Sequence, residues 1–263
     1  MTQGINMEPQ RLQAGQGWQW MKQGYALFMK APLLWMVLLL ICFIAMAGLS
    51  AIPVVGEPLS SLLLPAVMVG LMVGCRALEQ GEELELAHLF SGFQQHTAQL
   101  VTLGGIALVG QFLIFGLMMM VGGATLVSIL MSGQPPQDPQ VMAQAIAGAG
   151  FAVLIGVALF SVLLMAMQFA PMLVYFNGIA PVEAMKLSFR AFLANIGPML
   201  VYGVAFILLA ILASIPMMLG WLVLMPVMIT SLYACYSGIF PPQKESESAP
   251  AAGDDDKPTE GTL

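Results

Sequence analysis

The chain has 263 residues, of which 59% are hydrophobic and only 8% are charged. Soluble domains contain about 25% charged residues, so this composition excludes an ordinary soluble protein and requires lipid as the solvent. The formal net charge of -6 points to no nucleic-acid partner, because much of the acid lies in one loop and in the C-terminal tail.

The chain opens with a polar segment, residues 1–17, without the apolar core of a signal peptide. Next, Trp18, Met21, Tyr25 and Phe28 recur at the spacing of one helix face, which predicts an amphipathic helix. Such a helix suits the headgroup boundary of a membrane, and we expect these four side chains to face that boundary. A second interpretation is that the helix only sets the angle at which the next segment enters the membrane.

Six apolar stretches follow, each near the roughly 20 residues that cross a bilayer core as a helix. The sequence therefore predicts an all-α polytopic membrane protein, with a membrane domain over residues 18–240. The expected spans are residues 33–52, 59–75, 100–122, 151–175, 198–216 and 219–238. The three cysteines within or at the ends of spans, expected to be free thiols, are Cys42, Cys75 and Cys235.

Charge determines the orientation of these spans. All 8 basic residues fall on one side of the six-span arrangement, and the opposite connections carry only Glu57 and Asp138. Cytoplasmic loops are enriched in Lys and Arg, so we expect both termini in the cytoplasm. The tail, residues 241–263, is rich in Glu, Ser, Pro and Asp and is expected to be a disordered acidic cytoplasmic end.

The amphipathic pattern recurs before the third and fifth spans at constant offsets along the chain. The matching residues are Leu86, Phe90 and Phe93 before the third span, and Val182, Met185, Phe189 and Phe192 before the fifth. The copy before the third span is partial, because Glu83 occupies its first position. We predict three repeats, about residues 18–78, 83–177 and 182–240, each an amphipathic helix followed by a hairpin of two transmembrane helices. Because each repeat holds an even number of spans, the repeats would be related by a pseudo-threefold axis along the membrane normal.

Proline and glutamine are the notable residues inside the spans. Pro65, Pro171 and Pro226 lie in the even-numbered spans, and each removes a backbone donor and predicts a helix kink. Gln111 and Gln168 lie in the paired third and fourth spans, where their amides are expected to hydrogen-bond across the hairpin. Kinks of this kind line substrate paths in transporters, and they also occur as inherited packing features.

No residue pattern indicates catalysis. The middles of the spans hold no Asp, Glu, Lys, Arg or His, which weakens a proton-coupled pump. Glu82, Glu83, Glu85 and His88 are close enough in sequence for a metal site, but a solvated loop leading into a helix is the favoured interpretation. Serine-protease, phosphate-loop and zinc-type spacings are absent from the sequence, so we expect no catalytic, cofactor or metal site.

Four local motifs resemble those of a known family. They are Gly17-Trp18-Gln19-Trp20, Leu78-Glu79-Gln80-Gly81, His88-Leu89-Phe90-Ser91-Gly92-Phe93 and Ala180-Pro181-Val182-Glu183-Ala184-Met185-Lys186-Leu187-Ser188-Phe189. Over about residues 17–240 the chain resembles uncharacterised six-span bacterial inner-membrane proteins, and more distantly the membrane domain fused to some glycerophosphodiester phosphodiesterases. The resemblance implies a Gram-negative inner membrane. It implies no activity, because the phosphodiesterase domain itself is not present.

Three functional classes compete. The favoured one is a noncatalytic inner-membrane protein that organises lipids or partner proteins through its surface helices. The alternative is a transporter or channel for a small uncharged or amphiphilic solute, and an intramembrane enzyme is third. The lipid bilayer is the one partner that the sequence identifies. A protein partner and the oligomeric state are not predicted from the sequence.

Overall fold

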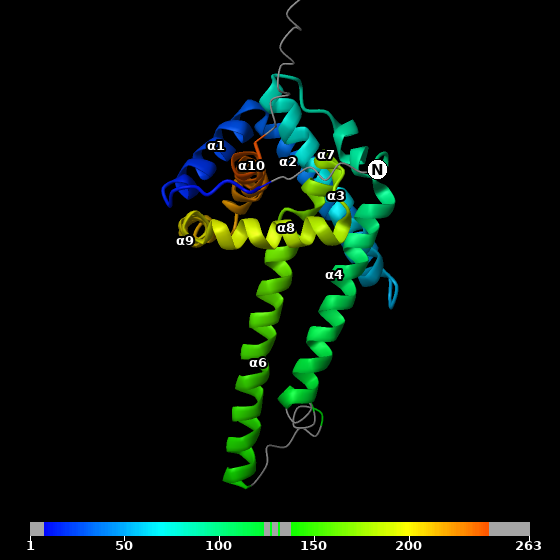
Figure 1. Ribbon diagram of the computed structural model, residues 1–263, viewed down its shortest axis with the longest axis vertical. Helices are drawn as coiled ribbons and strands as arrows, with labels where there is room; N and C mark the ends of the chain where they lie inside the picture. Colours follow the sequence, from blue (N-terminus) through cyan, green and yellow to red (C-terminus); the bar gives the residue numbers. More distant parts are fainter. Residues whose placement is uncertain (1–7, 124–126, 128–130, 132–137, 242–263) are drawn as a thin grey trace, which may run out of the picture.

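The computed structural model describes residues 8–123, 127, 131 and 138–241, which form helices joined by short connections (Figure 1). The elements are α1 (Gln16–Lys30), α2 (Pro32–Ser50), α3 (Gly56–Gln80), the 3-10 helix η1 (Leu86–Phe93), α4 (Thr97–Met118), the π-helix η2 (Met119–Gly123), α6 (Pro139–Met167), α7 (Ala170–Asn177), α8 (Pro181–Ala194), α9 (Ile196–Ser214) and α10 (Trp221–Ile239). Within these described residues there is no strand, and the predicted all-α class is confirmed.

The described helices include 6 segments that are long and apolar enough to cross a membrane, as predicted. They are Pro32–Ser50, Gly56–Gln80, Thr97–Gly122, Gln140–Asn177, Ile196–Ser214 and Trp221–Ile239. Large apolar side chains such as Phe43 on α2 and Ile207 on α9 point outward and are exposed. Lipid is the solvent that tolerates such a surface.

The fourth span begins earlier than predicted. The expected start was residue 151, whereas α6 begins at Pro139. The Asp138 carboxylate accepts a hydrogen bond from the backbone N–H of Gln140 at 2.8 Å, which satisfies one of the free donors at the helix start. Proline is favoured at the first helical position, so Asp138 and Pro139 together fix this boundary.

The same span is broken near its other end, where α6 stops at Met167 and α7 resumes at Ala170. The hydroxyl of Ser188 on α8 fills the break, accepting from the Phe169 N–H at 3.0 Å and donating to the Met165 carbonyl at 2.8 Å. Backbone groups in a membrane protein must find partners inside the protein, and here a neighbouring helix supplies one.

The even-numbered spans α3 and α10 form the centre of the molecule. Their apolar windows are 50% and 61% buried, against 11% for α2 and for α9. Each short helix covers an even-numbered span: α1 packs mainly on α10, η1 on α3, and α8 on α6 and α7. The fully buried core includes Trp20, Trp35, Phe169, Leu173 and Ile239. The three cysteines are free thiols, as predicted.

The pairs of long helices point in different directions. In Figure 1, α4 and α6 run along the long axis of the molecule and α8 crosses the upper end of α6. In the same view α9 and α10 are seen nearly end-on. The six apolar segments therefore do not form one parallel bundle. Helix α4 packs on α3 and on α6, and η2 at the far end of α4 also packs on α6, so these spans contact each other along much of their length.

Three predicted segments fall largely or partly outside the described residues. From residue 242 onward the acidic tail lies outside them, as do residues 1–7 of the polar N-terminal segment. The connection between the third and fourth spans is also outside over residues 132–137.

Candidate functional site

The helix α1 presents a different face to the protein from the one its aromatic spacing suggested. Met21 and Phe28, expected at the membrane boundary, are 4% and 2% exposed and belong to the core. The burial of Met21 and Phe28 has a steric cause: Gly24 faces α10, and a Cβ there would lie 2.6 Å from the Ser231 Cα. This close approach rotates Met21 and Phe28 inward and leaves Trp18 and Tyr25 about half exposed.

The other two short helices present more of their predicted faces outward. On η1, Phe90 is 62% exposed and Phe93 is 38% exposed. On α8, Met185, Phe189 and Phe192 are partly buried. The outward apolar side chains, which we call the apolar collar, are Trp18, Tyr25 and Met29 of α1, Leu86, Phe90 and Phe93 of η1, and Val182 and Leu193 of α8.

Basic side chains stand beside the collar. Lys22 on α1 lies between Trp18 and Tyr25 in sequence, and Lys186 holds the equivalent place on α8. Lys186 is exposed and donates to the Glu183 carboxylate at 2.8 Å. This hydrogen bond and the positive charge of Lys186 lower the pKa of the Glu183 carboxyl. An exposed pair of this kind adds little stability, so these charges are available to other partners.

The predicted glutamine pair does not form. Gln111 is exposed on α4, Gln168 lies half-buried at the break before α7, and no hydrogen bond joins these two described residues. The polar residues that do bond lie elsewhere: Thr230 on α10 is fully buried and donates to the Gly24 carbonyl of α1 at 2.8 Å. Polar groups in the spans thus hold α1 in place.

The three span prolines are all buried. Helices α3 and α10 continue through Pro65 and Pro226, whereas Pro171 stands in the first turn of α7 just after the break. Whether α3 and α10 bend at their prolines stays a prediction.

Three even-numbered spans meet in a polar node that was not predicted from the residue pattern. The Tyr233 hydroxyl donates to the Glu79 carboxylate at 2.6 Å, which links α10 to α3. The Tyr236 hydroxyl donates to the Asn177 side-chain oxygen at 2.6 Å, which links α10 to α7. Arg76 completes the ring of contacts, with its guanidinium 5.2 Å from the centre of the ring of Phe176 on α7.

Asn195 is another functional candidate that was not predicted from the sequence. It is fully buried between α8 and α9. Its side-chain oxygen accepts from the Leu12 N–H at 2.9 Å, and its amide donates to the Gln10 carbonyl at 2.8 Å. The Gln10 N–H in turn donates to the Ile239 carbonyl at 3.1 Å. The segment before α1 is therefore tied to the end of α10.

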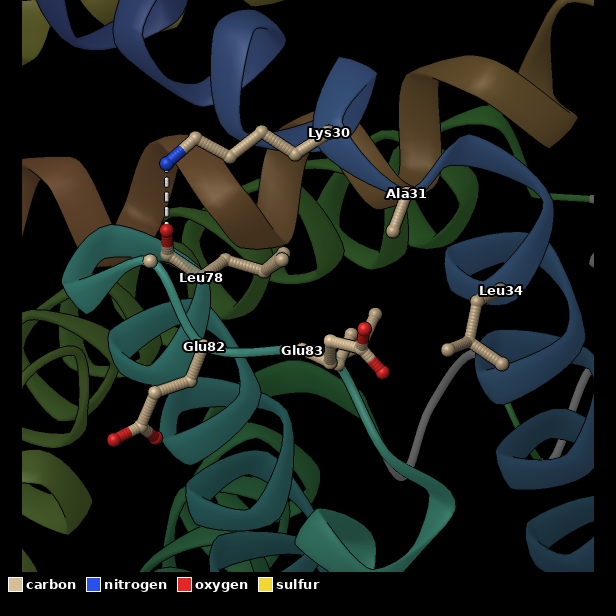
Figure 2. A pocket seen from close by; sticks show the side chains of 8 residues that line it. Lys30, Ala31, Leu34, Leu78, Glu82 and Glu83 are labelled. Atoms are coloured by element: carbon tan, nitrogen blue, oxygen red, sulfur yellow. Dashed lines mark hydrogen bonds between the residues drawn. The ribbon is translucent and has the colours of Figure 1, made fainter.

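A cavity of about 520 Å³ opens where α1 passes into α2 and α3 ends (Figure 2). Its lining combines apolar and charged side chains: Lys30, Ala31, Leu34, Leu78, Gly81, Glu82, Glu83 and Leu84. Lys30 donates to the Leu78 carbonyl at 2.6 Å, a favourable position for a cation at the C-terminal end of α3. A second cavity of about 520 Å³ lies between α1 and α10 beside Glu79 and Tyr233.

The acidic loop beyond this cavity forms a helix cap. The Glu85 N–H donates to the His88 Nδ1 at 3.1 Å as part of a capping box that starts η1. Among the described residues no group of three or more His, Cys, Asp and Glu is placed to hold a metal ion.

Comparison with known proteins decides the family. The chain is 32% identical over 246 residues to a probable inner membrane protein of Burkholderia thailandensis, covering 85% of this chain and 90% of that relative. The chain belongs to this family of inner-membrane proteins. No known family profile matches the chain, and no solved structure matches it.

For a member of this inner-membrane family, the arrangement separates two environments. The outer sides of α2, α4, α6 and α9 carry exposed apolar side chains suited to lipid. The end where α1, η1 and α8 lie carries the described basic residues, the polar node and both cavities. The basic side chains and the cavities that could bind a ligand therefore lie at one end of the spans.

Proposed function

We propose that this protein is a noncatalytic organiser of inner-membrane lipids, which gathers anionic phospholipids around its three short helices. The observation that carries the proposal is the apolar collar with basic side chains beside it. Apolar burial at the headgroup level and attraction to anionic lipid act together on such a surface. A basic residue near the membrane surface contributes about 1 kcal/mol to attraction by anionic lipid.

The three-repeat arrangement supports this role. Each short helix covers an even-numbered span of the repeat before it, and α1 closes the ring by packing on α10 of the last repeat. Equivalent contacts recur: Gly24 meets Ser231 of α10, and Leu89 meets Gly70 of α3. A pseudo-threefold arrangement of this kind would present the collar on three sides of the protein.

The proposal places the collar in the cytoplasmic leaflet, with both termini in the cytoplasm. It rests on the positive-inside rule, since the basic residues gather at the collar end. Reporter fusions at residue 241 and in the connection near Met217 test it. A cytoplasmic reporter should be active at residue 241 and silent near Met217, and the reverse pattern would contradict the orientation.

Transport of a small amphiphilic solute has less support. Its expected path ran beside the span prolines, but Pro65, Pro171 and Pro226 are buried, and none of them lines either cavity described above. The broken fourth span is the feature that favours transport, because broken helices surround many substrate sites. The Ser188 hydroxyl already satisfies the Phe169 N–H and the Met165 carbonyl, which the break leaves without partners in the helix.

Lipid retention tests the proposed function. The purified protein, held in nanodiscs of mixed phosphatidylglycerol and phosphatidylcholine, is released for native mass spectrometry, and the retained lipids are counted. We expect phosphatidylglycerol to be enriched, and the double variant K22Q/K186Q to lose most of that enrichment. The matched control is Met217→Ser, which removes a 92% exposed apolar side chain from the opposite end. Equal retention of both lipids by the unaltered protein would refute the proposal.

A further inference from the structure

The cavity at the junction of α1 and α2 is lined by opposite charges that do not neutralise each other. Lys30 stands on one wall, and Glu82 and Glu83 stand in the loop after α3. Within the described residues the one ion pair joins Lys186 to Glu183, so neither carboxylate pairs with Lys30. Opposite charges that share a cavity without touching leave room for a dipolar ligand between them.

The three charged side chains of the cavity point in different directions. Figure 2 shows Lys30 reaching to the Leu78 carbonyl at the end of α3, and the Glu83 carboxylate lying in the gap toward Leu34 of α2. The Glu82 carboxylate points to the other side of the loop. An ammonium group has three donors, so Lys30 keeps donors for a second acceptor beyond Leu78.

The apolar part of the lining continues toward the first span. Leu34 lies in the first turn of α2, and Leu84, in the loop after α3, is 6% exposed. The cavity therefore has a charged mouth and an apolar wall that begins where the first apolar helix begins. Its volume of about 520 Å³ falls in the range of roughly 300–1,000 Å³ that is common for small-molecule sites.

We propose that this cavity binds the headgroup of a phospholipid that carries a phosphate and a primary amine, such as phosphatidylethanolamine. The phosphate lies toward Lys30, the ammonium donates to Glu83, and the start of an acyl chain lies along Leu34. The site rests on the proposed function only in placing this end of the protein at the headgroup level. It adds a second lipid class, held in a cavity rather than gathered around the collar.

The lining distinguishes a primary amine from a quaternary one. Recognition of choline-type cations depends on aromatic side chains around the methyl groups, and none of the eight lining residues is aromatic. A carboxylate instead prefers a partner that donates hydrogen bonds. The cavity should therefore hold phosphatidylethanolamine in preference to phosphatidylcholine.

The test counts lipids retained by the full-length protein in native mass spectrometry, after exchange with phosphatidylethanolamine or phosphatidylcholine of identical acyl chains. We expect the ethanolamine lipid to be retained about tenfold better, which is the usual scale of one charge-assisted hydrogen bond. Glu83→Gln should abolish this preference, and Glu83→Asp should keep part of it. The matched control is Glu57→Gln, which alters an exposed carboxylate at the opposite end and should change nothing.

Equal retention of the two lipids by the unaltered protein would overturn the proposal, as would a preference that survives in Glu83→Gln. The lipid comparison needs no variant, so it holds even where a variant fails to fold. Soluble glycerophosphoethanolamine distinguishes a lipid from a free headgroup: it should not displace the bound lipid, and displacement at equal concentration would overturn the role of the acyl chain. Loss of phosphatidylglycerol enrichment in K22Q/K186Q, with the ethanolamine preference intact, tests the collar separately.

Discussion

Two adjacent glycines on α4 give a sharp test of how α4 packs on α3. A Cβ on Gly104 would lie 2.6 Å from the Leu62 Cα and 2.7 Å from the Ser61 carbonyl oxygen. That carbonyl lies four residues before Pro65, which has no N–H to offer it. A Cβ on Gly105 would meet only the end of the Leu62 side chain, at 3.6 Å. The first contact is with rigid backbone and the second is ordinary packing.

We expect Gly104→Ala to destabilise the protein relative to Gly105→Ala. Both changes gain about 1 kcal/mol of helix propensity, so this gain cancels between them. Overpacking costs about 1–3 kcal/mol, and that is the expected difference in free energy of unfolding. Unfolding in mixed detergent micelles, followed by circular dichroism, measures it. Equal stability of the two variants would show that α3 and α4 do not approach each other as closely as described.

Three further outcomes follow from the packing around α1 and α8. Gly24→Ala places a Cβ against the backbone of α10, whereas the Cβ of the matched control Gly203→Ala meets nothing. In the same unfolding assay, the free energy of unfolding of Gly24→Ala should be about 1–3 kcal/mol lower than that of Gly203→Ala. Asn195→Leu removes the buried amide that holds the N-terminal segment, so protease cleavage before α1 should become faster while helix content stays unchanged. Lys186→Met should raise the pKa of Glu183 toward its ordinary value in an NMR titration. Because this pKa is lowered in the folded state, the small stability from the pair is present near neutral pH and is lost as the pH falls through that pKa.

The six apolar segments could be predicted from the sequence because hydrophobic length is a local property of the chain. The start of the fourth span was also readable, since Asp138 and Pro139 form a capping signal that hydropathy alone passes over. The break before α7 was only half visible. Pro171 signals a lost donor, but the partner that closes the break is Ser188, from another helix.

The face that α1 buries could not be predicted from aromatic spacing alone. The rings of Trp18 and Phe28 are equally apolar to such an analysis, yet one is about half exposed and the other is buried. The deciding residues are Gly17 and Gly24, which let α1 approach α9 and α10 closely. Two glycines seven positions apart on a helix are the signal that would have identified the buried side. The cavity could not be predicted from the sequence, because Lys30 and Glu83 are far apart in the chain and only the fold places them around one cavity.

The contacts of α1 make a final, stringent prediction about the order of the chain. Helix α1 packs far more on α10 and α9 than on α2 and α3, and the Gln10 N–H bonds the Ile239 carbonyl at 3.1 Å. The start of the described chain and its end therefore lie side by side, the situation in which circular permutation is tolerated. A permutant that starts at Pro32 and carries residues 8–31 after residue 241 should unfold cooperatively, like the parent protein.

The matched control for the permutant is deletion of residues 8–31. Deletion exposes the buried hydroxyls of Thr230 and Ser231 and removes the Trp20 side chain from the core, so it should abolish the cooperative transition. If packing on α9 and α10 is what holds α1, attaching α1 after α10 should restore the cooperative transition. These contacts depend on where α1 lies in the fold and not on its place in the chain order. A permutant no more stable than the deletion would mean that the peptide link from α1 to α2 is what holds α1 in place, and the proposed ring of three repeats would lose its closing contact.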